Sequence, residues 1–340
     1  MTRRTFWIIF SLAVLLRIFW INVPALWYDE NYTMLVARLP FDRMMQAVVG
    51  DVHPPLWYLI EWSLFHIAPN LPAWAIRLPA LVFSILSLPM YIIVMRKLGI
   101  PSKVKTAAFV IMAFMPFQLW YAQEGRMYAM LEFFVLLTLS AALGRSYLFL
   151  FIGSLALLYT QNYGPFYLVS IALVIFIREK RDNLNWCISA MASAGLFWLP
   201  WFQVMLGQMN EINGQYWIMD KSIGGLLVIV YKLFFAAAVP AEWFVYSYIV
   251  TFAACIIGMT TFIASRNPGR LTIALMAFVP VLIAWLISLV WQPVVLSRPL
   301  IGISPFVYII AAWSFEDATT TKNRPDRLQT IHPGIARQAE

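Results

Sequence analysis

The sequence predicts an all-α polytopic membrane protein with about ten transmembrane helices and with further helices that lie in the membrane interface. Of the 340 residues, 62% are hydrophobic and only 12% are charged, whereas soluble domains have about 45–50% apolar and 25% charged residues. The mean hydropathy is +0.75. The apolar residues gather in stretches near the ~20 residues that a helix needs to cross a bilayer. A soluble enzyme, a disordered chain and a disulfide scaffold are therefore excluded.

Ten apolar stretches are candidate spans. Residues 146–177 hold 32 residues without a charge, and we expect two short spans there, because one span would place Arg145 on the wrong side of the membrane. The candidates are Phe6–Val23, Trp74–Met95, Thr106–Trp120, Met127–Leu143, Tyr147–Tyr159, Pro165–Ile177, Leu184–Leu206, Phe244–Ala264, Leu271–Trp291 and Pro299–Phe315.

Basic residues cluster between alternate spans. With the N-terminus in the cytoplasm, sixteen of the 24 basic residues fall on the cytoplasmic side, as the positive-inside rule requires. The net charge of +8 is therefore a signal of topology and indicates no nucleic-acid partner. Acidic residues collect on the opposite, extracytoplasmic side. We expect both termini in the cytoplasm and the functional loops outside.

The domain prediction is a single transmembrane domain over residues 1–315. Its first extracytoplasmic loop covers residues 24–73 and a later one covers residues 207–243. Within these loops, Leu56–Ile67 is too short to cross a bilayer, and Ser222–Val239 carries Lys232. We expect both to be helices in the outer interface. Residues 316–340 are polar and are expected to form a cytoplasmic tail.

Two extracytoplasmic loops carry acidic residues framed by aromatic ones. A partly desolvated carboxylate close to other carboxylates has a raised pKa, and a nearby arginine lowers it again, so such a loop suits a tuned general base. A lone acidic pair in a loop is more often ordinary surface, which leaves that alternative open at this stage. The candidate residues of the two loops are Asp29, Glu30, Asp51, His53, Tyr121 and Glu124.

Four arginines are candidate ligands for a phosphate group. Arg77, Arg126 and Arg298 fall on the same side as the acidic loops, and Arg17 lies within the first span. A guanidinium is a planar, permanently charged fork that matches phosphate oxygens. Burying Arg17 in a span costs about 3 kcal/mol on insertion scales. We expect a carboxylate or a ligand phosphate to offset that cost.

No cofactor is firmly required, but a divalent metal is a candidate. It would bind where Asp29, Asp51, His53 and Glu124 converge. Oxygen ligands would favour magnesium, manganese or calcium, and the histidine would admit zinc. The sequence has no metal-binding motif with regular ligand spacing, no glycine-rich phosphate loop and no nucleophile elbow.

The order of these motifs resembles that of the GT-C integral-membrane glycosyltransferases. The resemblance is greatest to the group of protein O-mannosyltransferases, lipid A aminoarabinose transferases and RgtA/B/C/D-like transferases. It is clear over residues 6–128 and thin over residues 145–290. The matching motifs are Asp29-Glu30, Asp51 to Leu56, Arg77-Leu78-Pro79, Tyr121 to Tyr128, and Arg298 ahead of Pro305.

The resemblance implies a transferase that moves a monosaccharide from a polyprenyl-phosphate donor to a glycan, lipid or protein acceptor. Asp29 would be the general base, with Glu30 beside it, and single displacement would invert the anomeric carbon. Asp51, His53, Tyr121 and Glu124 would support the base and the acceptor. Arg126, with Arg298, Arg77 and Arg17, would hold the donor phosphate. The location implied is a bacterial inner membrane.

Two other classes of function remain open from the sequence. The first alternative is a lipid or solute transporter, such as a flippase, for which charged residues inside spans are typical. Here only Arg17 and Glu132 clearly lie within spans, and the acidic cluster lies on one side of the membrane, which favours an enzyme. The second alternative is a lipid-binding subunit without catalytic activity.

Overall fold

The computed structural model describes residues 1–178, 181–211, 223–235, 245, 249, 268–291 and 293–322, and all regular structure within them is helical. The all-α prediction is thus confirmed for this part of the chain. The helices are α1 Arg3–Ile18, α2 Tyr28–Ala37, α3 Phe41–Val49, α4 Leu56–Ile67, η1 Ala73–Arg77, α5 Leu78–Lys97, α6 Ser102–Phe114, α7 Pro116–Ala122, α8 Tyr128–Leu143, α9 Tyr147–Thr160, α10 Gly164–Arg178, α11 Arg181–Glu211, α12 Ile223–Phe235, α14 Pro268–Val290, η3 Ile301–Ile303 and α15 Ser304–Lys322.

Nine of the ten candidate spans coincide with helices, and Phe244–Ala264 falls outside the described residues apart from two isolated positions. By length and composition, three described helical segments can cross a membrane: Ala73–Lys97, Leu184–Met209 and Gly269–Val290. A fourth is the bent pair α6 and α7. The other apolar helices are shorter, so the total of ten spans stays a prediction. Residues 146–177 form two helices, α9 and α10, as expected.

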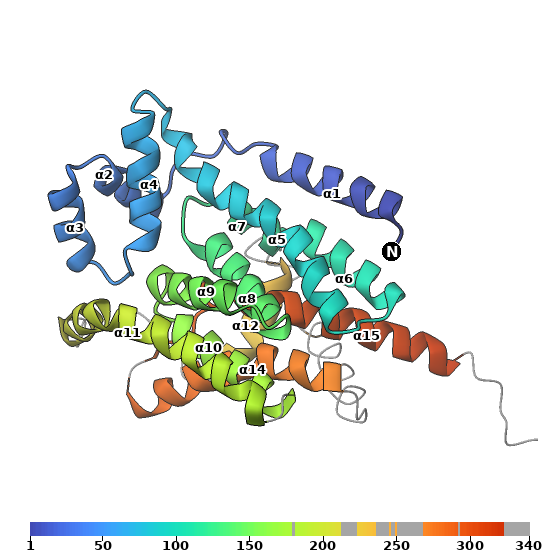
Figure 1. The fold of residues 1–340 in the computed structure, drawn as a ribbon. Helices are drawn as coiled ribbons and strands as arrows, with labels where there is room; N and C mark the ends of the chain where they lie inside the picture. The colour runs from blue at the N-terminus through green and yellow to red at the C-terminus, as the bar shows by residue number, and fades with distance from the viewer. Residues whose placement is uncertain are drawn as a thin grey trace, which may run out of the picture.

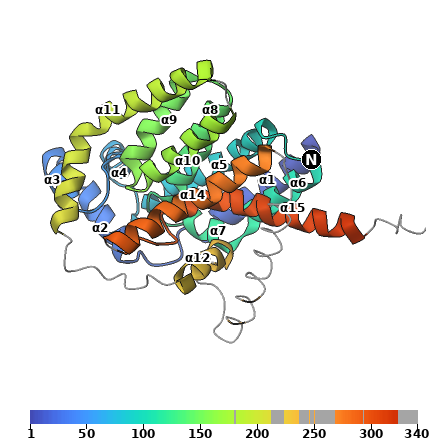
Figure 2. The ribbon, with the colours of Figure 1, turned by 90° about the horizontal axis from the view of Figure 1, so that it is seen from below.

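The two ends of the molecule differ in what they carry. The N-terminus and the C-terminal end of α15 lie at one end, and α2, α3 and α4 lie at the other (Figures 1 and 2). The predicted helix Leu56–Ile67 has the bounds of α4, which packs mainly against α2. The first loop is thus a small helical unit that presents the Asp29-Glu30 pair at the start of α2.

The second predicted interfacial helix and the polar tail differ in detail from the expectation. α12 lies within the predicted Ser222–Val239 helix, and it packs into the bundle: Tyr308 of α15 donates a hydrogen bond to the Leu233 carbonyl at 2.5 Å. α15 continues to Lys322, inside the predicted tail. Residues 323–340 of that tail lie outside the described residues.

A break between α6 and α7 explains the buried arginine of the first span. Pro116 has no N–H to donate to the Met112 carbonyl, and the two helices meet at 52°. Arg17 is fully buried and donates instead to the carbonyls of Met112 at 3.1 Å and Ala113 at 2.8 Å. Its Nε bonds Ser84 at 2.9 Å. The partner expected for Arg17, a carboxylate or a phosphate, is therefore replaced by carbonyl oxygens that the helix break exposes.

A second buried polar cluster joins α7, α8 and α15. Gln118 donates to Glu132 at 2.7 Å, and Ser304 donates to the same carboxylate oxygen at 3.0 Å. All three side chains are buried. Because buried polar groups are stable only when they are paired, this cluster fixes α7 against α15. Each of these helices adjoins a segment that carries a candidate site residue, Glu124 after α7 and Arg298 before α15.

We predict that Arg17→Ala lowers the unfolding free energy by about 2–4 kcal/mol, because it leaves the Met112 and Ala113 carbonyls buried without donors. The measurement is thermal unfolding in detergent. Ser84→Ala, which removes one of the hydrogen bonds of Arg17, is the matched control and should cost about 1 kcal/mol. Equal losses for the two variants would contradict this role of Arg17.

Candidate functional site

A bidentate ion pair between Glu30 and Arg77 lies at the centre of the two acidic loops. Arg77 donates through Nε and Nη2 to the two carboxylate oxygens, each at 2.8 Å, and both side chains are buried. The remaining N–H groups of Arg77 bond the carbonyls of Ile21, Pro24 and Ala25. All five N–H groups of Arg77 are therefore used within the protein, and none remains for a phosphate.

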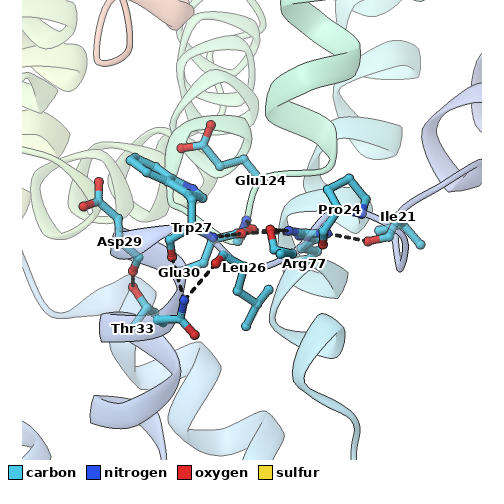
Figure 3. A network of polar contacts seen from close by, with 12 residues as sticks. Ile21, Pro24, Leu26, Trp27, Asp29, Glu30, Thr33, Arg77 and Glu124 are labelled. Atoms are coloured by element: carbon cyan, nitrogen blue, oxygen red, sulfur yellow. Dashed lines mark hydrogen bonds and ion pairs between the residues drawn. The ribbon is translucent and has the colours of Figure 1, made fainter.

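Glu30 also joins the first loop to the second. Its carboxylate accepts a hydrogen bond from the Gly125 backbone N–H at 2.7 Å and one from the Trp27 backbone N–H at 3.3 Å. Figure 3 shows this network, with Asp29 and Glu124 extending from it toward the same side. With four N–H donors on its two oxygens, Glu30 is held as a structural anion. Of the two carboxylates, only Asp29 is accessible: its side chain is 30% exposed, whereas that of Glu30 is 1% exposed.

Gly125 is the point of closest approach between the two loops. A Cβ atom there would lie 2.9 Å from Ile76 Cγ2, 3.1 Å from the Ile76 carbonyl and 3.3 Å from Glu30 Oε1. The Ile76 side chain would have to shift, and the Ile76 carbonyl would have to give way by a few tenths of an ångström. Only glycine allows the second loop to approach Glu30 closely enough to donate its N–H.

We predict that Gly125→Ala destabilises the protein by about 1–3 kcal/mol through this overpacking. Gly195→Ala is the matched control, because no atom lies within 4 Å of the Cβ position there, and alanine is the better helix former. Thermal unfolding of the two variants measures the difference. A Gly125→Ala protein as stable as the wild type would show that the loops approach each other less closely.

Asp29 lies in the first turn of α2, where the helix dipole stabilises a negative charge. Its carboxylate is 3.4 Å from Arg298 Nη1, and the side chains of Asp29 and Arg298 are 30% and 40% exposed. The Arg298 guanidinium also lies over the Trp27 ring, 4.6 Å from the ring centroid. The structure thus brings two predicted site residues from opposite ends of the chain together, and both remain accessible.

Arg126 is buried and is linked to Asp29 through Thr33. Its Nη1 donates to the Thr33 hydroxyl at 2.7 Å, and Thr33 in turn donates to the Asp29 carbonyl at 2.8 Å. Arg126 also contacts Tyr58 Oη and His53 Nε2, each at 3.4 Å. Its Nε has no partner, and no carboxylate among the described residues forms an ion pair with it. Arg126 is thus a buried cation that lacks a counter-ion.

Asp51 and His53 form a pair beside Arg126. Tyr58 donates to Asp51 at 2.6 Å, and His53 Nδ1 lies 3.3 Å from the same oxygen. Burial raises the pKa of Asp51, but hydrogen bonds from His53, Tyr58 and the Val52 backbone outweigh it and lower the pKa to about 2. Burial lowers the pKa of His53. The pair is therefore an ionised carboxylate beside a neutral imidazole at neutral pH.

Glu124 is the second buried carboxyl group of the site. Trp120 donates to its Oε2 at 2.9 Å, and Oε1 is buried without a hydrogen-bond partner. Burial raises the pKa of Glu124 from its usual 4.5 to about 7, although the positive charge of Arg298 acts in the opposite direction. Tyr121, another predicted site residue, packs edge-on against Tyr128, with the two ring centroids 5.2 Å apart, and lies near Glu124.

We predict a loss of stability with rising pH that depends on Glu124. Its pKa is higher in the folded protein than in the unfolded chain, so the contribution of the neutral carboxyl is complete below pH 4.5 and is lost as pH rises to about 7. We compare the unfolding free energy of the wild type with that of Glu124→Gln. Between pH 4.5 and a pH above 7, this difference should shift against the wild type by on the order of 3 kcal/mol. Thermal unfolding of both proteins at pH 5 and pH 8 measures this, and a difference that does not change with pH would contradict it.

The candidate metal ligands do not gather into one site. Asp51 and His53 pair with each other, Asp29 faces Arg298, and Glu124 accepts from Trp120. Among the described residues, no group of three or more histidine, cysteine, aspartate or glutamate side chains is placed to hold a metal ion. Both ring nitrogens of His53 also face protein groups. The arrangement does not fit the divalent metal considered from the sequence.

The sequence did not reveal three residues that assemble this site. Thr33 and Tyr58 connect Arg126 to Asp29 and Asp51. Gln123 donates to the carbonyls of Leu16, Arg17 and Phe19 and so holds the second loop against the end of α1. The one available signal was spacing, since Thr33 follows Asp29 by four residues and therefore shares its face of a helix.

Comparisons with known proteins show which fold the chain has. No family model matches the sequence, and no curated protein sequence matches it, but solved structures do. ArnT from Cupriavidus metallidurans bound to undecaprenyl phosphate matches with a TM-score of 0.60 at 13% identity. The same protein in the apo state matches with a TM-score of 0.62 at 11% identity. The chain has the GT-C fold.

The similarity to ArnT covers most of this chain and part of the other. It extends over 93% and 94% of this chain, which spans 61% and 62% of the two ArnT chains. The GT-C resemblance predicted from the loop motifs is thus confirmed at the level of the fold. The chain therefore shares the fold of ArnT, and its apolar helices are those of an integral membrane protein.

Proposed function

We propose that this GT-C protein transfers a monosaccharide from a polyprenyl-phosphate donor to an extracytoplasmic glycan, lipid or protein acceptor. The observation that carries the proposal is Arg126, a buried guanidinium without a counter-ion, which Thr33 links to the Asp29 helix turn. A buried charge without a partner is costly, and a phosphate would supply the missing anion. The solved ArnT structure, which contains undecaprenyl phosphate, supports this class of ligand.

The donors left on Arg126 suit a phosphate. Of its five N–H groups, two on Nη1 face Thr33 and Tyr58, and one on Nη2 faces His53. The Nε–H and the second Nη2–H remain, and a guanidinium can present two such groups as a fork to phosphate oxygens. Arg298 adds a second positive charge on the exposed side of Asp29.

In the proposed reaction, the Asp29 carboxylate accepts the proton of an acceptor hydroxyl, and that oxygen attacks the anomeric carbon of the donor. The bond from the anomeric carbon to the phosphate oxygen breaks, and its electron pair stays on the departing polyprenyl phosphate. Arg126 and Arg298 stabilise the added negative charge. One displacement from the opposite face inverts the anomeric carbon.

The other predicted residues take supporting roles in this proposal. Arg77 and Glu30 position the loops, since their polar atoms are already paired. Arg17 stabilises the break between α6 and α7 and does not bind the donor. Glu124, beside Arg298, contacts the acceptor or the leaving phosphate. We place the protein in a bacterial inner membrane, with both termini in the cytoplasm and this site outside.

We predict that Asp29→Asn lowers turnover at least ~100-fold, because the general base is lost, and leaves the melting temperature and undecaprenyl phosphate binding near those of the wild type. The assay incubates the protein in isolated membranes with radiolabelled polyprenyl-phosphate sugars and follows transfer of the label. Asp42→Asn, at an exposed position of α3, is the matched control. Near-normal turnover of Asp29→Asn would remove Asp29 from the mechanism.

The same preparation separates the alternatives. Reconstituted vesicles that move labelled lipid from one leaflet to the other, without transfer of the sugar, would support a flippase. Vesicles that bind undecaprenyl phosphate without either activity would support a lipid-binding subunit. Label that appears in a new glycosidic product only with the wild type supports the transferase.

A further inference from the structure

Arg126 is held by neutral groups, although an anion lies close by. The Asp51 carboxylate does not form an ion pair with it. Instead, Tyr58 and His53 both contact the same oxygen of Asp51, and both contact Arg126. Two neutral side chains therefore stand between the anion and the cation. Their lone pairs face Arg126, whose charge stays unneutralised.

The contacts determine the protonation of His53. A guanidinium only donates hydrogen bonds, so the His53 Nε2 that lies 3.4 Å from Arg126 Nη2 must offer a lone pair. A neutral imidazole has one N–H, so the proton is on Nδ1, which lies 3.3 Å from Asp51 without forming a hydrogen bond to it. His53 is therefore the neutral Nδ1–H tautomer. Its burial also favours the neutral form.

This arrangement has a consequence for binding. If Asp51 bonded Arg126 directly, a phosphate would have to displace a carboxylate to reach the guanidinium. Because His53 and Tyr58 lie between them, Asp51 orients Arg126 without neutralising its charge. The Nε–H, which has no partner, stays available.

We propose that Asp51 and His53 are positioning residues of the donor site: Asp51 acts on Arg126 through the Tyr58 hydroxyl, and the Nδ1–H tautomer of His53 accepts a hydrogen bond from Arg126 at Nε2, so that the guanidinium is held ready for the donor phosphate. The inference rests on the proposed role of Arg126 in donor binding. It assigns the Asp51-Val52-His53 motif to phosphate recognition, where the sequence suggested contact with the acceptor or a metal.

The first test reads the tautomer directly and needs no activity. The chain has three histidines, so the full-length protein labelled with ¹⁵N-histidine gives few signals. The signals of His53 are assigned by their loss in His53→Gln. The proposal expects a protonated Nδ1 and an unprotonated Nε2 at neutral pH. An Nε2–H tautomer or a doubly protonated ring would overturn it.

The second test measures undecaprenyl phosphate binding to the protein in nanodiscs by titration followed with native mass spectrometry. His53→Leu removes both hydrogen-bonding nitrogens and should weaken binding about 10-fold, the effect of one lost hydrogen bond to a charged group. His53→Gln keeps one donor and one acceptor and should stay within about 3-fold of the wild type. His66→Gln, an exposed position, is the matched control and should bind like the wild type.

The outcomes separate this inference from the proposed function. If Arg126→Leu abolishes binding while His53→Leu binds like the wild type, the positioning role is overturned and the donor role of Arg126 stands. If Arg126→Leu binds as tightly as the wild type, the donor role fails and the positioning role fails with it. If His53→Leu and His53→Gln lose binding equally, the hydrogen-bonding role of His53 toward Arg126 is also overturned, since glutamine rescue is what distinguishes it from a structural role.

Discussion

The ion pair of Glu30 and Arg77 is the interaction on which the end of the molecule that carries α2, α3 and α4 depends. Arg77 donates hydrogen bonds to carbonyls of the segment that follows α1, and Glu30 accepts one from the Gly125 backbone N–H of the second loop. Three chain segments that are distant in sequence thus meet at one buried pair. Removal of either partner would leave a charge buried alone, which costs far more than the pair contributes. Asp29 and Arg126 owe their relative positions to this junction.

The four arginines of the sequence motifs fall into two groups, according to how many of their N–H groups have partners within the protein. All five N–H groups of Arg77 have partners, and Arg17 has four hydrogen bonds inside the bundle. Among the described residues, the Nε–H of Arg126 has no partner, and Arg298 is partly exposed beside Asp29. Only the last two therefore have capacity for a ligand. An arginine in a motif is evidence for a phosphate site only when its own chain does not satisfy it.

The sequence predicted the helical architecture, the short helix Leu56–Ile67 and the accessible Asp29, because hydropathy, length and charge are local properties. It did not predict the partners of the arginines. A guanidinium in an apolar segment has the same sequence pattern whether carbonyls, a carboxylate or a phosphate will satisfy it. Thr33 and Tyr58 were missed for the same reason, since their roles arise from the packing of α2 against α4. The divalent metal was considered because the acidic loops share one side, but their side chains pair separately.

The break between α6 and α7 also bears on how the chain enters the membrane. Arg17 belongs to α1, which is synthesised before α6, and its carbonyl partners lie 95 and 96 residues later. Until α6 arrives, the first segment carries an unpaired cation whose insertion costs about 3 kcal/mol. Its stable placement must therefore wait for the later helix, and the two segments assemble as a unit. The Arg17 guanidinium, which pairs with the carbonyls at the break between α6 and α7, thus makes the assembly of the fold depend on the order in which these helices enter the membrane.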